Sequence, residues 1–441
     1  MGRSGSLMHH FTVENLRRAF QELSGSKAAG IDRVTKEEYG KELEKNLQQL
    51  TERICKGGWR PQPSREVLIP KPQGGTRPLA IGCLEDKVVQ VLTARILEAL
   101  YEPLFHRHSY GFRRGKSAHQ ALGRLHEVID VRRESAVVVE IDIEKFFNSI
   151  DHSRLLEILG QKVSDSFFLR HVRRLLRGSI LHTDGTLAET LTGTPQGSPV
   201  SPVLANICLN HILDQWFREN YASRGEMVRY ADDAVFVFGD EAVAREFLQA
   251  LEARMNDVGL NLNKDKCSIV PFSSSKPKGC FSFLGFKFFW SRNRRKQPLL
   301  KLKTDPKRLH RCMQAFEHWI KTWRNRLKLA KLWELAAAKL TGHYHYFGVS
   351  FNQAKLGHFY WAATQSLFKW LNRRSQRRSF TMERFLKRLH FQPLPRPPAG
   401  FELKDITRNY GPERNHKPKS RMRENRKSGS VRSANLRLVF T

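Results

Sequence analysis

The sequence is poor in cysteine and has no long hydrophobic run. Its six cysteines are scattered over 441 residues, and no two of them have C-x-x-C spacing. This spacing argues against a zinc ribbon and favours reduced thiols in a cytosolic protein, although the even count would also permit disulfides. No stretch approaches about 18 uncharged apolar residues, and residues 1–10 have no apolar core of signal-peptide length. We therefore expect neither a membrane span nor a secretion signal.

Acidic residues are few compared with basic ones. The chain has 76 Lys and Arg against 43 Asp and Glu, which gives a net charge of +33. A surplus of this size makes the chain repel itself unless a polyanion is near, so nucleic acid is the leading partner and an anionic membrane surface the weaker one. Hydrophobic residues make up 40% of the sequence, which is too many for a disordered basic chain.

Strand and helix patterns alternate over the first two thirds of the sequence. This alternation predicts a mixed α/β body from about residue 60 to 290, after an N-terminal helical region over 11–52. Beyond Pro306 the pattern becomes helical and basic, and it is followed by a Pro-rich linker over 392–398 and a basic low-complexity tail over 399–441. Within the body, helices are expected over 86–104, 150–162, 166–178, 199–219 and 242–258, and strands over 67–69, 77–81, 136–142, 227–238 (two) and 281–290 (a pair).

Two acidic sites lie about ninety residues apart. Asp142 ends the apolar segment 137–141, and Asp232 with Asp233 lies between two apolar segments. Buried strands normally exclude unpaired carboxylates, so acids at strand ends make sense if they share Mg²⁺, which prefers one or two carboxylates together with substrate phosphates. Two such ions about 4 Å apart can activate a 3′-hydroxyl and stabilise departing pyrophosphate. A polar hairpin turn would explain Asp232 and Asp233 alone, but Tyr-x-Asp-Asp after a strand-terminal Asp favours the metal site.

Two loops accompany the acids. Gly193 to Asn206 combines Gly and Pro in a tight loop that leads into a helix, so Gln196 could rest against a nucleotide or a template base. A plain helix-start loop is the alternative. A basic hairpin carries Lys71 and Arg77 around Gly74-Gly75, which suits a triphosphate clamp or a solvated surface equally well.

In this order the motifs resemble those of reverse transcriptases, and specifically of bacterial group II intron-encoded proteins. The resemblance covers residues 10 to 390. It rests on Gly30-Ile-Asp32, Ile69-Pro-Lys-Pro72 with Thr76-Arg-Pro78, Tyr110-Gly-Phe-Arg113, Asp142 with Phe146-Phe147, the Gln196 loop, Tyr230-Ala-Asp-Asp233, the segment 259–266 and Phe283-Leu-Gly285.

The resemblance implies a role for each matching residue. Asp142, Asp232 and Asp233 match the catalytic, metal-binding triad, and Ile143 is counted with the metal site. Phe147 matches the ribose gate that favours deoxynucleotides, although packing in the core would also explain it. Lys266 matches a lysine near the primer end or is an ordinary turn lysine. Together the implied nucleotide-binding residues are Lys71, Arg77, Phe146, Phe147, Gln196 and Lys266, and the nucleic-acid-binding ones are Arg113, Tyr230, Arg373, Arg374, Arg377 and Arg378.

The resemblance also implies a domain order. A right-hand polymerase is expected, with an N-terminal helical extension over 1–58, fingers and palm over 59–300, a helical thumb or maturase (X) domain over 301–391, and a basic nucleic-acid-binding segment over 392–441. The thumb tryptophans Trp319, Trp323 and Trp333 suit RNA stacking, but core packing is the stronger interpretation. Longer family members carry a Cys- and His-bearing endonuclease domain that nothing here matches, so target nicking by this chain is not expected.

The implied activity is RNA-templated DNA synthesis with two Mg²⁺ ions, together with binding and splicing of a structured intron RNA and a part in retromobility. The partners would be structured RNA, a DNA primer or target, and dNTPs, in the bacterial cytoplasm near the nucleoid. The alternatives are a related reverse transcriptase in phage defence or DNA repair, and a non-catalytic RNA-binding splicing factor.

Overall fold

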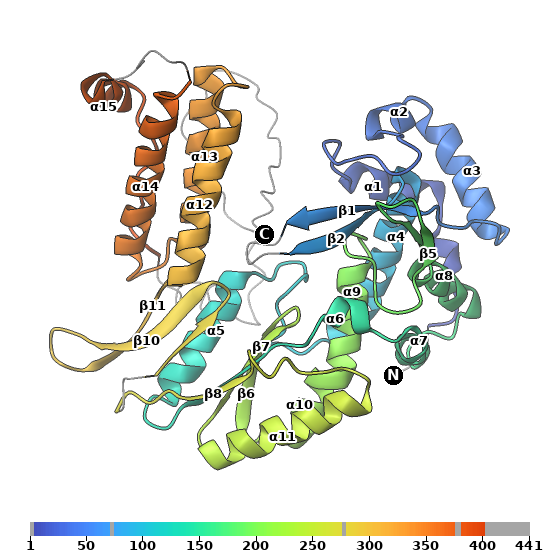
Figure 1. The fold of residues 1–441 in the computed structure, drawn as a ribbon. Helices are drawn as coiled ribbons and strands as arrows, with labels where there is room; N and C mark the ends of the chain where they lie inside the picture. The colour runs from blue at the N-terminus through green and yellow to red at the C-terminus, as the bar shows by residue number, and fades with distance from the viewer. Residues whose placement is uncertain (1–3, 71–74, 276–278, 375–380, 402–441) are drawn as a thin grey trace, which may run out of the picture.

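The computed structural model describes residues 4–70, 75–275, 279–374 and 381–401, and Figure 1 shows how their helices and strands are arranged. Helices α1–α4 and a sheet lie on one side of the molecule, the helices α12–α15 on the other, and a central sheet joins them below (Figure 1). The mixed α/β body expected from the sequence is confirmed.

The N-terminal helices begin at side-chain caps. Thr12 accepts a hydrogen bond from the Asn15 amide at the start of α1, and Thr35 with Glu38 forms a capping box at the start of α2. The helical region expected over 11–52 is therefore interrupted, and its second part is divided again. The helices are α1 (Val13–Glu22), α2 (Lys36–Lys41), α3 (Leu43–Cys55) and α4 (Leu84–Tyr101).

The N-terminal sheet contains the basic hairpin. Strands β1 and β2 are antiparallel with Pro70 opposite Thr76, as the sequence predicts, and β1 also pairs in parallel with the short strand β4. The sequence did not predict β4 or β5. The strand order is β2-β1-β4-β5, with bounds β1 (Ser64–Pro70), β2 (Thr76–Ile81), β4 (Ser179–Leu181) and β5 (Leu187–Glu189).

The central sheet is covered on both faces, which explains its almost continuous apolar strands. Along β3, Val137, Val139 and Ile141 pack in one core with α9 and α11, whereas Val138 faces a second core with α5. The strand order is β6-β7-β3-β8, and all its pairs are antiparallel. The bounds are β3 (Val137–Ile141), β6 (Gly225–Tyr230), β7 (Asp233–Phe238), β8 (Ser268–Pro271), α5 (Ala118–Val131), α6 (Phe146–Ser149), α7 (His152–Gly160), α8 (Ser166–Leu176), α9 (Ser201–Leu209), a π-helical turn (Asn210–Asp214), α10 (Gln215–Asn220) and α11 (Glu241–Asp257).

A small sheet leads into the C-terminal helices. Strands β9, β10 and β11 share the second core with these helices, so the division expected at residue 300 falls inside β11. The Pro-rich stretch 392–398 is packed, since Leu394 is buried and the Trp333 indole donates to the Gln392 carbonyl. The bounds are β9 (Cys280–Phe283), β10 (Phe286–Arg292), β11 (Pro298–Thr304), α12 (Pro306–Trp323), α13 (Leu329–Phe347), α14 (Gln353–Leu371) and α15 (Met382–Phe391).

Two further observations concern the chain as a whole. All six cysteines are free thiols, and Cys83, Cys208 and Cys312 are buried. Within the described ranges, no helix has both the length and the apolar character needed to cross a membrane.

Candidate active site

Two strand ends bring the predicted acids to one place. Strand β3 pairs antiparallel with β7, and Ile141 lies opposite Ala234. Asp142 follows β3 directly and Asp233 is the first residue of β7, so continuing the register places Asp142 beside Asp233. Acids about ninety residues apart in the sequence thus meet where these two neighbouring strands of the central sheet end and begin.

Asp232 belongs to the turn that joins β6 to β7. Tyr230 pairs with Asp233, which leaves a two-residue turn of Ala231 and Asp232. Ala231 has a φ of +59°, a left-handed conformation that costs a non-glycine residue roughly 1–2 kcal/mol. The backbone of Gly111 lies against this turn, and a Cβ on Gly111 would come within 2.2 Å of the Ala231 nitrogen. Only glycine fits at this position.

The three carboxylates influence one another electrostatically. Partial burial, and then the charge of Asp142, raise the pKa of Asp232, while a hydrogen bond from its own backbone amide and the charges of Arg77 and Arg229 oppose this rise. Partial burial, and then the charges of Asp232 and Asp142, raise the pKa of Asp233 to about 7, although its side chain still reaches solvent. Carboxylates that repel one another in this way are stabilised by a shared cation.

Lys266 supplies one positive charge. Its Nζ donates to Asp142 Oδ2 at 3.0 Å, and it also lowers the pKa of Asp233. Within the part of the chain that the structure describes, no group of three His, Cys, Asp or Glu side chains is arranged to hold a metal ion. The chemistry of the donors nevertheless fits a hard divalent cation, because the site offers carboxylate oxygens in a locally negative environment.

The predicted part of Ile143 in a metal site could be played only by its backbone, since the residue is only 4% exposed. Ile143 forms a bridge with Leu262, but the hydrogen bonds of this bridge use the Asp142 carbonyl and the Glu144 amide. The Ile143 carbonyl therefore takes no part in these two bonds.

The basic hairpin and the Gln196 loop are joined beside the acids. Arg77 Nε donates to Gln196 Oε1 at 2.5 Å, and Gln196 Nε2 donates to Asn148 Oδ1 at 2.9 Å. The Ala80 amide also donates to the Gln196 carbonyl at 2.8 Å. The structure thus brings Arg77 and Gln196 together. Lys71 lies outside the described residues.

The two phenylalanines after Asp142 differ in exposure. Phe147 is half-buried, and the Phe112 ring lies 6.4 Å from its ring, edge to face. Phe146 is only 1% exposed and packs in the core with Ile141 and Ile143, so its ring offers no surface to a nucleotide. A contact of Phe146 with a nucleotide would have to use its backbone. The sequence analysis did not assign Phe112, which is 53% exposed at a φ of +57°, although it belongs to the Tyr110–Arg113 motif.

Arg113 is also used differently from the prediction. Its side chain is 6% exposed and its guanidinium donates to Glu102 and to the carbonyls of His106 and Ser109. These contacts hold the loop together and leave no free surface for nucleic acid. Tyr230 closes the hairpin opposite Asp233, and its binding to nucleic acid stays a prediction.

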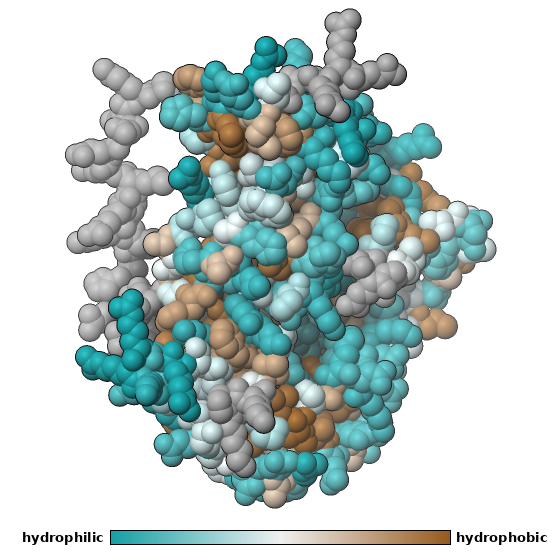
Figure 2. Space-filling view, turned by 60° about the vertical axis from the view of Figure 1, so that its left-hand side comes forward, coloured by the Kyte–Doolittle hydropathy of each residue, from teal (hydrophilic) through white to brown (hydrophobic). Residues whose placement is uncertain are grey.

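Four arginines after α14 were predicted to bind nucleic acid, and the structure describes two of them. Arg373 is exposed and its guanidinium lies 5.2 Å from the Trp370 ring, whereas Arg374 donates to the Leu327 carbonyl at 3.0 Å. Arg377 and Arg378 lie outside the described residues, as does the basic tail from 402 onwards. Figure 2 shows a face of the molecule on which hydrophilic residues predominate, with smaller hydrophobic patches among them.

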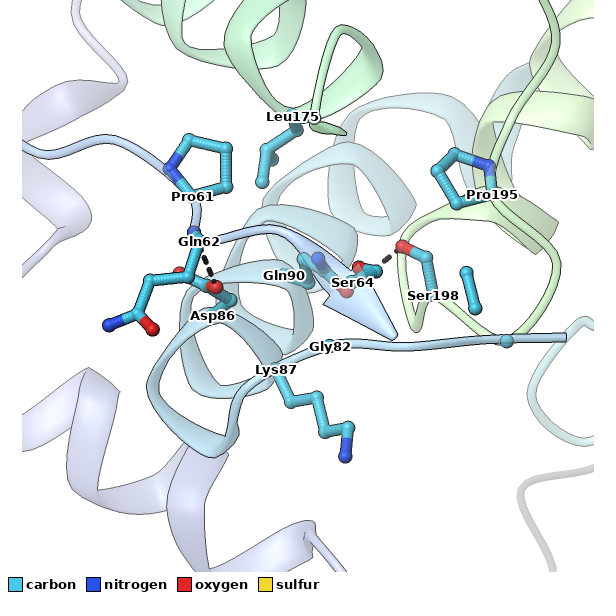
Figure 3. A pocket seen from close by; sticks show the side chains of 13 residues that line it. Pro61, Gln62, Ser64, Gly82, Asp86, Lys87, Gln90, Leu175, Pro195 and Ser198 are labelled. Carbon is cyan, nitrogen blue, oxygen red and sulfur yellow. Dashed lines mark hydrogen bonds between the residues drawn. The ribbon is translucent and has the colours of Figure 1, made fainter. Parts of the chain in front are cut away.

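A pocket lies next to the Gln196 loop rather than at the aspartates (Figure 3). Its walls come from the start of β1, the first turns of α4 and the loop around Ser198. Ser198 Oγ donates to Gln90 Oε1 at 2.9 Å, and the Gln62 amide donates to Asp86 Oδ2 at 2.9 Å. Burial above all raises the pKa of Asp86 to about 7. This carboxyl lies in an ordinary helical pattern, so nothing in the sequence distinguishes it.

Comparison with known proteins places this site in a family. Residues 69–288 match the family described as reverse transcriptase (RNA-dependent DNA polymerase). This range includes the three aspartates, the Gln196 loop and all four strands of the central sheet.

Curated relatives include proteins named for introns. The chain is 33% identical over 199 residues to the group II intron-encoded protein LtrA of Lactococcus lactis, which covers 45% of this chain and 32% of LtrA. It is 34% identical over 291 residues to the putative COX1/OXI3 intron 1 protein of Saccharomyces cerevisiae, covering 54% of this chain and 34% of that protein. The chain thus spans about a third of the length of these two relatives.

A third relative is matched over most of its own length. Protein YkfC of Escherichia coli is 29% identical over 307 residues, which cover 61% of this chain and 78% of YkfC. Taken together with the geometry of the aspartates, these matches show that the chain belongs to the reverse transcriptase family and is similar, over the parts that they cover, to group II intron-encoded proteins.

Proposed function

We propose that this chain is an RNA-directed DNA polymerase whose active site is formed by Asp142, Asp232 and Asp233. The observation that carries the proposal is the register of β3 and β7, in which Ile141 lies opposite Ala234 and the acids follow at the same edge. Asp142, Asp232, Asp233 and the Ile143 carbonyl would hold two Mg²⁺ ions. When bound, such ions activate a 3′-hydroxyl and stabilise the departing pyrophosphate.

The residues around the acids would bind and orient the nucleotide. Arg77 would grip the triphosphate, because guanidinium forms strong charge-assisted hydrogen bonds with phosphate oxygens. Gln196 holds Arg77 on one side and Asn148 on the other, which sets the position of the guanidinium beside Asp232. Phe147 would exclude the 2′-hydroxyl of a ribonucleotide. Lys266 would orient the Asp142 carboxylate.

We also propose that the chain binds a structured intron RNA and assists its splicing, with α12–α15 as the thumb or maturase domain. The net charge of +33 supports a polyanionic partner, and Arg373 beside Trp370 combines a cation with an aromatic ring on this domain. A part in retromobility would follow from the intron-encoded relatives, two of which are named for introns.

Primer extension tests the polymerase proposal. An RNA template with an annealed DNA primer is extended with dNTPs and Mg²⁺ by the wild type and by a double variant, Asp232→Asn with Asp233→Asn. The double variant should lose about a thousandfold or more in rate, since carboxylate-held metal supplies several kcal/mol of transition-state stabilisation. Equal extension by both proteins would overturn the assigned active site, and no extension by the wild type would leave a non-catalytic RNA-binding protein.

A matched control separates catalysis from folding. Asp184 lies in an exposed turn and accepts hydrogen bonds from the Thr186 amide and hydroxyl, which an asparagine can also do. Asp184→Asn should extend primers at the wild-type rate.

The RNA-binding proposal is tested by the salt dependence of binding, where log K should fall with log salt by about 0.7–0.9 per phosphate contacted. A flat response would contradict it.

A further inference from the structure

A stripe of buried polar residues lies on one helix of the palm. Asn206, Asn210 and Asp214 are four residues apart, and none is more than 4% exposed although their neighbours on α9 are apolar. Buried polar groups are costly unless they are hydrogen-bonded. In a regular α-helix, two residues that are eight positions apart do not lie on the same face. The π-helical turn Asn210–Asp214 is wound more loosely, and this difference returns Asp214 to the face of Asn206. We name these three residues the polar stripe.

The polar stripe holds the side chain of Arg229, which is 0% exposed. Arg229 Nε and Nη2 donate to the two carboxylate oxygens of Asp214 at 2.7 and 2.5 Å, and Nη1 donates to Asn206 Oδ1 at 3.0 Å. A buried carboxylate and a bidentate guanidinium neutralise each other and fix the plane of the guanidinium. Arg229 is therefore rigidly oriented from the helix side.

The same guanidinium reaches the turn that carries Asp232. Arg229 Nη1 also donates to the Ala231 carbonyl at 2.8 Å. Ala231 has a φ of +59°, and a strained conformation of this kind persists only where surrounding contacts impose it. The Ala231 carbonyl and the Asp232 amide belong to one planar peptide group. A hydrogen bond that fixes the carbonyl therefore also fixes the orientation of the Asp232 backbone nitrogen.

The polar stripe holds the neighbouring loop as well. Asn206 Nδ2 donates to the Gly111 carbonyl at 2.8 Å, and the His106 amide donates to Asn210 Oδ1 at 3.2 Å. The backbone of Arg229 completes the attachment, since the Tyr110 amide donates to the Arg229 carbonyl at 2.8 Å and the Arg229 amide donates to the His108 carbonyl at 3.0 Å. The loop that presses Gly111 against Ala231 is thus held by the residues that hold Arg229.

We propose that Arg229 is a positioning residue for polymerisation, which sets the Ala231-Asp232 peptide through its bond to the Ala231 carbonyl, and that Asp214 and Asn206 hold its guanidinium for this purpose. The proposal rests on the proposed polymerase function and assigns to these residues a role in the rate of that reaction. Arg229 does not touch substrate in this role. It acts through the turn that carries Asp232.

A paired substitution separates positioning from simple stability. Arg229→Met alone leaves the Asp214 carboxylate buried and unpaired, so it should lower the melting temperature. Arg229→Met combined with Asp214→Leu removes both charges, and replacing a buried ion pair by apolar residues is often neutral for stability. We expect the double variant to recover most of the melting temperature, whereas kcat for primer extension stays roughly tenfold or more below wild type. The KM for dNTP and the Kd for the template–primer duplex should change little.

A second readout does not depend on catalysis. Hydrogen exchange of the amides in residues 227–238 should become faster in the double variant, while exchange in α11 and β3 stays at the wild-type rate. If kcat and local exchange both return to wild-type values together with the melting temperature, Arg229 has only a structural role and the proposal is wrong. If the wild type itself does not extend primers, the proposed function fails, and the exchange rates alone decide whether Arg229 fixes the turn.

Two more variants complete the design. Arg229→Lys keeps a positive charge for Asp214, but its compact ammonium group cannot replace the guanidinium that joins Asp214, Asn206 and the Ala231 carbonyl. This variant should therefore fold, even where the double variant does not, and it should show the same loss of kcat. Wild-type kcat in Arg229→Lys would overturn the proposal. Arg224→Met is the matched control, because Arg224 precedes the same strand and its guanidinium pairs with Glu246 at 2.9 Å, away from the turn. It should leave kcat and local exchange unchanged, and an equal loss of kcat there would remove the case for Arg229.

Discussion

Lys266 Nζ and Asp142 Oδ2 lie 3.0 Å apart, although 124 residues separate them in the sequence. The ion pair puts an ammonium group beside a carboxylate that we assign to the metal site. Both groups are partly exposed, with 59% of the Lys266 side chain and 30% of the Asp142 side chain accessible. A pair of this kind is worth little in water and can be exchanged for another cation.

This relationship predicts that Lys266 competes with Mg²⁺ for Asp142. In Lys266→Gln the concentration of Mg²⁺ that gives half-maximal extension should fall by roughly twofold to fivefold, since an exposed pair is worth up to about 1 kcal/mol. Lys264→Gln is the control, because Lys264 pairs with Glu252 instead. A titration of extension rate against Mg²⁺ measures both variants. An unchanged or higher Mg²⁺ requirement in Lys266→Gln would contradict competition.

Arg77 is expected to bind the triphosphate. Arg77→Leu should raise the KM for dNTP by about tenfold to a hundredfold, since one charge-assisted hydrogen bond contributes about 1.5–3 kcal/mol. Arg65 lies on the neighbouring strand and its guanidinium donates to the Ala29 carbonyl, so Arg65→Leu serves as the control. Steady-state kinetics with varied dNTP give both values. Equal KM values for the two variants would show that Arg77 does not bind nucleotide.

Phe147 is expected to exclude ribonucleotides. In Phe147→Ala the preference for dNTP over rNTP, measured as a ratio of kcat/KM, should fall by roughly tenfold to a hundredfold. Phe146→Leu provides the contrast, because Phe146 is buried in the core and its replacement should lower the melting temperature without changing sugar preference. If Phe147→Ala keeps the wild-type preference, its ring serves packing alone.

The buried Asp86 carboxyl should make the free energy of unfolding depend on pH, and this effect is independent of catalysis. Its carboxyl is 3% exposed, and burial raises its pKa to about 7 in the folded protein, well above the unfolded value. Between about pH 4 and 7 the folded state therefore binds more protons than the unfolded state, so this group makes stability fall as the pH rises through that range. The loss is complete above about pH 7.

Asp86→Asn should remove this loss while keeping an acceptor for the Gln62 amide. At pH 8 the variant should be more stable than wild type by roughly 1–4 kcal/mol, and at pH 4 the difference should nearly disappear. Urea unfolding at the two pH values measures it. A variant that is less stable than wild type at pH 8 would show that the ionised carboxylate is stabilised in the fold.

Residues that combine local pattern with chemistry could be predicted from the sequence. The apolar segment before Asp142 and the turn at Asp232 are local signals, and an acid at the end of a buried strand is unusual enough to identify. Arg77 and Gln196 were also found, because Pro and Gly mark the loops that carry them. The sequence alone did not show that Arg77 and Gln196 touch each other, since that contact joins segments 119 residues apart.

Other features depend on tertiary structure and could not be predicted. Strands β4 and β5 have three residues each, which is too short for an alternating pattern to be recognised. Phe146 and Phe147 are the same residue type, and α6, which follows the left-handed Lys145 at a φ of +47°, turns the ring of Phe146 into the core. Arg229 looks like an ordinary strand cation until the polar stripe on α9 is placed opposite it.

The central claim is that Asp142 and Asp232 share bound metal, and iron-directed cleavage tests it most directly. Fe²⁺ bound in place of Mg²⁺, with ascorbate and peroxide, cuts the polypeptide only near the ion. We predict cuts near residue 142 and near residues 232–233 in the same sample, suppressed by excess Mg²⁺ and absent from Asp142→Asn combined with Asp232→Asn. Cuts at only one of these segments, or cuts that persist in the double variant, would contradict the account.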